Sequence, residues 1–242
     1  KTMMGLNYPK FKMPREFLID DSMIDEPLPA AEAGSAEVLR GPTIVVPESP
    51  KPLPESLAGQ VLGKYGDKIT TDHIMPAGAF LKYRSNVPEY SKYVFNCFNE
   101  EGQPTFAERG LALKQQDVAG IVVGGDSYGQ GSSREHAALC PMYLGVRVVI
   151  AKAIERIHKA NLINFCIVPL EFDNPADYDK ISQDDEFEIP GLLDAVKDKD
   201  SVTIMDKTAG VEFVGKLNLS QRDRDILLAG GLLAYTRKKA GK

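Results

Sequence analysis

The sequence predicts an α/β protein with a core of parallel strands and helices, to which antiparallel strands are added. Three apolar runs, at residues 118–123, 146–151 and 167–170, are separated by two stretches with helical spacing of apolar residues. Continuous apolar runs that alternate with helices are typical of parallel strands buried on both faces. The stretch 201–214 is instead typical of an antiparallel hairpin.

The N-terminal part of the chain differs in composition from the rest. Nine of the 16 prolines fall within the first 54 residues. Such a segment predicts an extended linker that builds no core of its own, with residues 43–46 as the candidate for a docked strand. We therefore expect a proline-rich tether over residues 1–57 and a folded domain over residues 58–242. A chain that begins at Lys1 leaves open whether it is a fragment or a natural subunit.

The predicted elements of the domain follow one another without internal repeats. They are a strand at 118–123, a glycine-rich turn, a helix from Ser132, a strand at 146–151, a helix over about 154–165, a strand at 167–170, a hairpin of 201–205 with 211–214, and a last helix from Ser220 to Gly230. Ser220 followed by Asp223 is the spacing of a helix N-terminal cap, and the pair Gly230-Gly231 is a stop signal.

Charge, hydropathy and cysteine content exclude several classes of protein. A formal charge of −5 with scattered lysines gives no basic footprint for nucleic acid, and no run of about 18 apolar residues is present to span a membrane. The three cysteines stand at wide spacings that match neither a disulfide framework nor a zinc or ferredoxin site. We expect a reducing compartment, either the cytoplasm or the mitochondrial matrix, and no secretion.

The most informative stretch is the glycine-rich segment 124–136, Gly-Gly-Asp-Ser-Tyr-Gly-Gln-Gly-Ser-Ser-Arg-Glu-His, between a strand and a helix. Its glycines allow close approach of the backbone to a ligand, and the helix N-terminus adds positive potential. The segment therefore predicts an anion site. Its spacing is neither the dinucleotide fingerprint nor a phosphate loop ending in Gly-Lys-Ser/Thr.

The serines of this stretch admit two other interpretations. Ser132 with Glu135 has the spacing of a capping box, which would give Ser132 a structural role. Ser127 lies in a Gly-x-Ser-x-Gly pattern like the nucleophile elbow of α/β-hydrolases, with His136 or His158 as the base and Glu135 or Glu155 as the acid. Capping does not exclude catalysis.

A second stretch, residues 66–78, is rich in turn formers and hydrogen-bonding side chains and contains the pair Asp72-His73. Such a pair often only orders a turn. Together, however, the two stretches resemble the aconitase superfamily through the patterns Asp-Lys-Ile-Thr-Thr-Asp-His-Ile with Pro-Ala-Gly and Tyr-Gly-x-Gly-Ser-Ser-Arg-Glu-His-Ala. Residues 156–162 and 226–233 look like further landmarks of the family, so that the resemblance runs from about residue 58 to residue 235.

The resemblance implies the fold and the site. The fold would be an aconitase-type swivel domain, and the run 79–84 looks like aconitase rather than a shorter dehydratase small subunit. Met75 departs from the pattern of many mitochondrial aconitases, which have serine there, and this departure leaves room for an acid related to citrate. By similarity, Ser132 is the catalytic base, Asp72 and His73 complete the catalytic group, and Arg84, Ser133 and Arg134 bind substrate carboxylates. Inward amides, a helix N-terminus and arginines would stabilise the anionic form of a serine base.

The family further implies a [4Fe-4S] cluster that is bound by other domains and not by this chain. Its partners would be those cluster-bearing domains and a tricarboxylate (citrate, cis-aconitate or isocitrate), without nucleic acid or membrane. The expected function is isomerisation of citrate and isocitrate by dehydration and rehydration. The first alternative is the small subunit of 3-isopropylmalate or homoaconitate dehydratase, and another is the Ser127 hydrolase. A third, an RNA-binding regulator, is disfavoured by the acidic balance and the absence of a basic patch.

Overall fold

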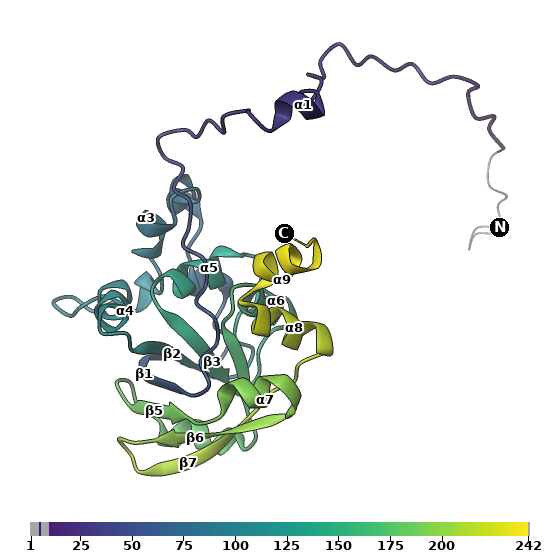
Figure 1. Cartoon of the computed structure of the whole chain (residues 1–242). Helices are drawn as coiled ribbons and strands as arrows, with labels where there is room; N and C mark the ends of the chain where they lie inside the picture. The colour runs from purple at the N-terminus through teal and green to yellow at the C-terminus, as the bar shows by residue number, and fades with distance from the viewer. Residues whose placement is uncertain (1–4, 6–9, 242) are drawn as a thin grey trace. The chain divides into compact units, whose positions relative to one another are not determined.

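The computed structural model describes residue 5 and residues 10–241, and the chain divides into two compact units. The first unit, Lys1–Arg40, contains the four-residue helix α1 at Ala30–Ala33, and its described residues are exposed. The second unit, Gly41–Lys242, contains the remaining described helices and the seven strands of the ring (Figure 1). None of the described helices is long and apolar enough to cross a membrane.

The seven strands close into a barrel in the order β1-β2-β3-β4-β7-β6-β5. The parallel part consists of β1 (Leu57–Lys64), β2 (Ala119–Gly124), β3 (Val146–Ala151) and β4 (Val168–Phe172). The antiparallel part consists of β5 (Glu186–Ile189), β6 (Ser201–Asp206) and β7 (Val211–Lys216), where β7 pairs with β4 and β5 pairs with β1. The predicted parallel core with added antiparallel strands is confirmed.

The helices surround this barrel and fill its connections. They are α2 (Thr71–Ile74), α3 (Val87–Ser91), α4 (Phe106–Gln115), α5 (His136–Tyr143), α6 (Arg156–Asn164), α7 (Leu192–Asp198), α8 (Gln221–Ala229) and α9 (Leu232–Lys239), with short 3-10 helices at Gly78–Tyr83, Asn96–Phe98 and Pro175–Lys180. The cap predicted at Ser220 is present, since Ser220 and Asp223 bond each other's backbone amides and Gly230 ends α8 in a left-handed conformation.

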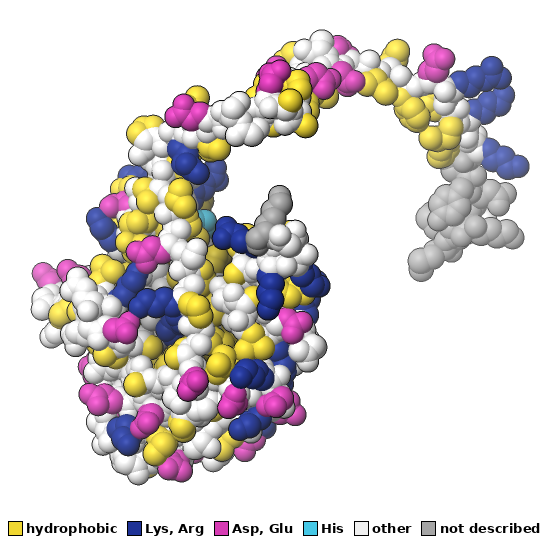
Figure 2. Space-filling model, in the orientation of Figure 1, with side chains coloured by type: hydrophobic (Ala, Val, Ile, Leu, Met, Phe, Trp, Pro, Cys, Tyr) yellow, Lys and Arg dark blue, Asp and Glu magenta, His cyan; other side chains and the backbone are white. Residues whose placement is uncertain are grey.

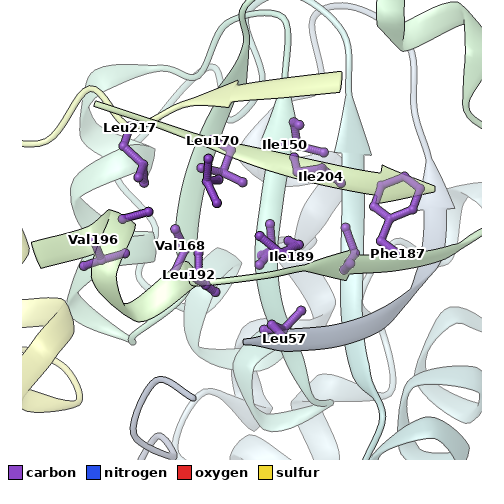
Figure 3. Close-up of a cluster of buried hydrophobic side chains, with 14 of the residues drawn as sticks. Leu57, Ile150, Val168, Leu170, Phe187, Ile189, Leu192, Val196, Ile204 and Leu217 are labelled. Atoms are coloured by element: carbon purple, nitrogen blue, oxygen red, sulfur yellow. The ribbon is translucent and has the colours of Figure 1, made fainter. Parts of the chain in front are cut away.

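The strands bury side chains on both faces, as their continuous apolar runs predict. Ile121 and Val123 of β2 lie in the cluster inside the barrel, which Figure 3 shows, whereas Val122 faces a second cluster under the helices. Tyr90 of α3 and Cys140 of α5 belong to that second cluster. Burial of one apolar side chain contributes about 1.5–3 kcal/mol, so both faces stabilise the barrel.

Residues 43–46 do not form the expected strand. Val45 alone bridges to Asn86, with its N–H 2.9 Å from the Ser85 carbonyl oxygen. Leu53 and Leu57 further along are buried in the cluster inside the barrel, so the chain from Gly41 onward packs with the second unit.

On the face drawn in Figure 2, basic and acidic side chains are interspersed over β5, β6 and β7. This agrees with the scattered positions of the lysines in the sequence.

Candidate active site

Two loops that are distant in sequence meet at one end of the barrel, where strands β1 and β2 end. Residues 66–78 follow β1 and residues 124–136 follow β2, and these two strands are parallel neighbours. Backbone bonds join the loops: the Gly129 N–H lies 2.7 Å from the Ile69 carbonyl oxygen, and the Thr71 N–H lies 2.8 Å from that of Gln130. The two motifs that the sequence singled out therefore form one continuous surface.

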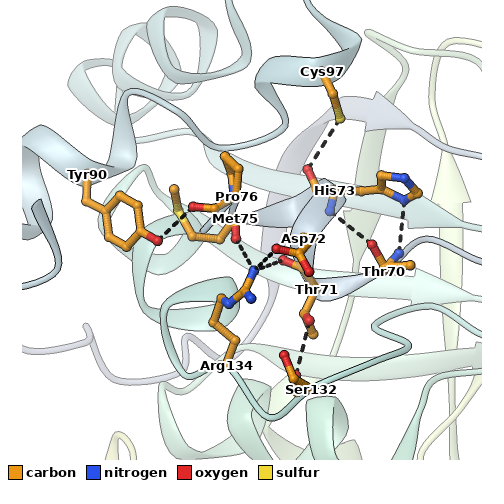
Figure 4. A network of polar contacts seen from close by, with 10 residues as sticks. All are labelled: Thr70, Thr71, Asp72, His73, Met75, Pro76, Tyr90, Cys97, Ser132 and Arg134. Atoms are coloured by element: carbon orange, nitrogen blue, oxygen red, sulfur yellow. Dashed lines mark hydrogen bonds and ion pairs between the residues drawn. The ribbon is translucent and has the colours of Figure 1, made fainter. Parts of the chain in front are cut away.

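Arg134 links the two loops through its side chain (Figure 4). Its Nη1 donates to Asp72 Oδ1 at 2.6 Å, to the Met75 carbonyl at 2.6 Å and to the Thr71 carbonyl at 3.4 Å. Only 14% of the Arg134 side chain is exposed. Nη1 thus holds helix α2 in place. The other N–H groups of the guanidinium have no acceptor among the described residues.

Asp72 is the partner that faces solvent, since 63% of its side chain is exposed. The hydrogen bond from Arg134 holds the pKa of the Asp72 carboxyl below its ordinary value, so that Asp72 is an anion at neutral pH. Asp72 and Arg134 therefore form an ion pair whose acidic end is open to solvent.

Ser132 and Ser133 lie exposed on the same surface. Thr71 Oγ1 donates to the Ser132 carbonyl at 3.1 Å, which fixes the backbone that carries the Ser132 hydroxyl. Within the part of the chain that the structure describes, the amides of Gly131, Ser132 and Ser133 have no acceptor. Three free amides beside an arginine can stabilise an anion.

Fewer backbone amides of the glycine-rich stretch are free to bind an anion than the sequence predicted. The amides of Gly125, Tyr128, Gly129 and Gln130 already donate to backbone carbonyls, and the amide of Asp126 donates to Asp67 Oδ1 at 2.8 Å. These amides hold the loop against its neighbours and are not available to a ligand. The available donors begin at Gly131.

The capping box predicted for Ser132 and Glu135 is wrong. Helix α5 begins at His136, and Glu135 occupies the cap position without a side-chain capping bond. Gly131 has a φ of +108°, and the Ser132 carbonyl is bound by Thr71, so residues 131–135 do not enter the helix. The Ser132 hydroxyl is therefore not used as a cap.

His73 does form a capping box. Its N–H donates to Thr70 Oγ1 and its Nδ1 accepts from the Thr70 N–H, each at 3.1 Å. This leaves Nε2 of His73 as the protonated nitrogen. The catalytic role expected of His73 stays a prediction, since its observed contacts order the start of α2.

Arg84 ends the 3-10 helix at Gly78–Tyr83, and its side chain is exposed. The His136 Nε2 lies 2.9 Å from the Arg84 carbonyl oxygen and donates to it, which ties Arg84 to the first residue of α5. The structure thus brings the backbone of Arg84 to the same helix end that follows Ser132 and Arg134.

Ser127 does not meet a histidine. It has a φ of +57° and donates its hydroxyl to Glu155 Oε1. His136 is bound to the Arg84 carbonyl, and His158 makes no side-chain hydrogen bond among the described residues. The serine–histidine contact that the hydrolase interpretation needs is therefore not formed.

His158 has a role that the sequence did not predict. This residue of α6 is 1% exposed, and neither ring nitrogen has a partner among the described residues. Its ring lies against the glycine-rich loop: a Cβ on Gly129 would fall 2.3 Å from His158 Cγ. The buried His158 ring therefore packs under Gly129 and supports the loop that leads to Ser132. The run 156–162 marks this helix in the sequence, but only the fold shows what it supports.

We expect Gly129→Ala to lower the free energy of unfolding by about 3 kcal/mol, since it combines a clash with a φ of +85°. Gly210→Ala is the matched control, because Gly210 has a φ of +68° and open space at the Cβ position, and should cost about 1 kcal/mol. Urea unfolding of both variants measures the difference. Equal losses in both would contradict the contact with His158.

His158 also makes stability depend on pH. Burial lowers the pKa of His158 from 6.5 to about 4. Between these values the unfolded state binds a proton that the folded state does not, so stability falls as the pH falls. We expect a loss of up to about 3 kcal/mol from this group between pH 7 and pH 4. In His158→Phe this pH-dependent loss of stability should disappear, whereas in the control His136→Gln it should remain. Urea unfolding at pH 7 and at pH 4.5 measures the difference.

Comparison with known proteins identifies the family of the chain. The model of the family described as "Aconitase C-terminal domain" matches residues 82–175. A Dictyostelium discoideum protein named "Probable aconitate hydratase, mitochondrial" is 41% identical over 204 residues, which are 76% of this chain and 26% of that protein. "Aconitate hydratase, mitochondrial" of Saccharomyces cerevisiae is 35% identical over 190 residues, 71% of this chain and 24% of that protein.

A solved structure shares the fold. It is 3-isopropylmalate dehydratase of Methanocaldococcus jannaschii, with a TM-score of 0.58 and 27% identity over 76% of this chain and 95% of that chain. The chain spans about a quarter of the length of the curated relatives above.

Proposed function

The chain is a C-terminal domain of the aconitase superfamily, and from this premise we propose that it supplies the serine base and the carboxylate-binding residues of an aconitate hydratase. The substrates would be citrate, cis-aconitate and isocitrate. The observation that carries the proposal is the link of the two loops through Arg134, which places Asp72 beside the loop of Ser132. Residues 1–57 would connect this domain to the others, with the part from Gly41 onward packed on the domain.

The proposed mechanism assigns each group a step. The Ser132 side chain, as an alkoxide, takes the proton from a substrate carbon and returns it in the rehydration. The free amides of residues 131–133 lower the cost of that anion. The cluster of the other domains, when bound, would supply the Lewis acid that accepts the substrate hydroxyl as its C–O bond breaks. Arg84, Arg134 and Ser133 hold substrate carboxylates, because a guanidinium meets a carboxylate with two parallel hydrogen bonds. Asp72 holds Arg134 in place, and His73 orders the turn that carries Asp72.

We infer that the cysteines of this chain are not ligands of an iron–sulfur cluster. Cys140 and Cys166 are buried, and burial raises the pKa of Cys140 to about 12 and also raises that of Cys166. Burial likewise raises the pKa of Cys97, the exposed one. Cys166 belongs to the cluster inside the barrel and Cys140 to the second cluster under the helices, so the two buried thiols do not face a common site. We propose that the [4Fe-4S] cluster of the complete enzyme is held by other domains.

We therefore expect the isolated chain to stay colourless after incubation with iron and sulfide under reducing conditions and to be inactive toward isocitrate. Addition of the cluster-bearing domains should restore turnover. Visible absorption spectra and the formation of cis-aconitate measure the two results. A brown chain with a charge-transfer band would contradict the assignment of the cluster.

A second candidate function follows from the likeness to 3-isopropylmalate dehydratase, which covers 95% of that chain. Under this alternative the chain would be a small subunit that acts on isopropylmalate or homoaconitate. Met75 does not discriminate through its side chain, because that side chain is fully buried. Parallel assays of the assembled protein on isocitrate and 3-isopropylmalate separate the two, and we expect the higher kcat/KM on isocitrate. The relatives' names support the mitochondrial matrix over the cytoplasm.

A further inference from the structure

A cavity of about 380 Å³ lies at the end of the barrel opposite to the candidate active site. It is placed where the parallel strands begin, next to Leu57 of β1, Ala119 of β2 and Arg147 of β3. The active-site loops follow the other ends of these strands. This volume is in the range of sites for small molecules.

Arg147 is the cation of this cavity that lacks an acidic partner. Its Nη2 donates to the Pro52 carbonyl at 2.9 Å, whereas its Nε is buried without an acceptor. Among the described residues no carboxylate lies within ion-pair distance of Arg147. Only one of the five N–H donors of this guanidinium is therefore used. Arg147 is half-buried, and an anion in the cavity would give its buried Nε–H an acceptor and its charge a partner.

The other charges at the cavity are already paired. Lys51 bonds Asp117 and Lys114 bonds Glu48, each at 2.7 Å. These two carboxylates repel a second negative charge on a ligand, so the cavity favours a monoanion over a polyanion such as citrate. Its walls also carry apolar surface, which a ligand with a hydrocarbon body would cover; these residues are Pro52, Pro54, Leu57, Val118 and Met142.

We propose that this cavity binds a small aliphatic monocarboxylate, with the carboxylate on the Arg147 guanidinium and the hydrocarbon chain against the apolar wall. A planar carboxylate can accept two parallel hydrogen bonds from the guanidinium, which an alcohol of the same length cannot. The proposal does not depend on the activity assigned to the opposite end of the barrel.

Hexanoate is the probe, and the methyl resonances of the methionines are the readout. We expect hexanoate to shift the Met142 methyl, which lies in the cavity wall, with a dissociation constant on the order of 1 mM. The buried methyl of Met75 should not move, so that a change spread through the whole molecule is told apart from binding in the cavity. Hexanol and citrate, at the same concentration, should leave Met142 unchanged.

Arg147→Met should weaken hexanoate binding at least tenfold, while Arg222→Met, a matched change at an exposed arginine of α8, should not. Val118→Phe narrows the cavity, keeps Arg147 and should also weaken binding. The remaining methyl resonances show whether each variant is folded. The proposal fails if hexanoate does not shift the Met142 methyl in the full chain or if hexanol binds as well as hexanoate. It also fails if Arg147→Met, when folded, binds hexanoate like the parent chain.

Discussion

Replacement of Ser132 by alanine should lower kcat of the complete enzyme about 1,000-fold, because loss of a positioned general base typically costs between 100- and 10,000-fold. The substitution removes only a hydroxyl that is exposed and is not a helix cap. The Ser132 contact to Thr71 is made by the backbone carbonyl and remains. We therefore expect an unchanged fold and an unchanged KM within a few-fold, measured by steady-state kinetics on isocitrate.

Ser127→Ala is the matched control for this experiment. Ser127 lies in the same loop, and its hydroxyl donates to Glu155 rather than facing the free amides. We expect its kcat to stay within a few-fold of the parent enzyme. A large loss in Ser127→Ala together with a small loss in Ser132→Ala would mean that the assigned base is the wrong serine.

Arg84→Lys and Arg134→Lys should each lower kcat about 100-fold in the complete enzyme. Lysine keeps the charge but loses the planar pair of donors, so the substrate carboxylate is attracted without being oriented. A displacement of the reacting carbon by about 1 Å costs on the order of 100-fold in rate. If either arginine only attracted the substrate, KM would rise and kcat would stay unchanged.

The two arginine variants should differ in stability, which provides an internal control. Arg134 donates to three acceptors of the 66–78 loop, so Arg134→Lys should also lower the free energy of unfolding by about 1–2 kcal/mol. The Arg84 side chain is exposed, and Arg84→Lys should be as stable as the parent. Near-parental kcat in both variants would show that the substrate carboxylates bind elsewhere.

The sequence predicted the parallel part of the fold because local patterns determine it. The runs that became β2, β3 and β4 are continuous and apolar, and each strand is buried on both faces. Strand β1 was not predicted, since it carries Gly59 and Gly63 and an exposed Ala58 and has no continuous pattern. Closure of the barrel by β1 with β5 is a pairing of residues more than 100 positions apart, which no local pattern encodes.

At the candidate site the sequence predicted which segments matter but not how their hydrogen bonds are used. The spacing of Ser132 and Glu135 is that of a capping box, yet a tertiary bond from Thr71 keeps residue 132 out of the helix. The same kind of box is formed instead by Thr70 with His73, where the side chain is a histidine rather than the usual glutamate. Local spacing could not distinguish these cases, because the deciding contact joins residues 61 positions apart.

The closed ring of strands has a consequence for how this unit associates with other domains. An open sheet exposes a row of unpaired N–H and C=O groups at its edges, and such rows pair readily with other chains. Here β5 pairs with β1 and β4 pairs with β7, so the ring leaves no such edge. A unit without such an edge exposes no template for aggregation, and in the proposed assembly its docking contacts would be made by loops and side chains rather than by strand addition.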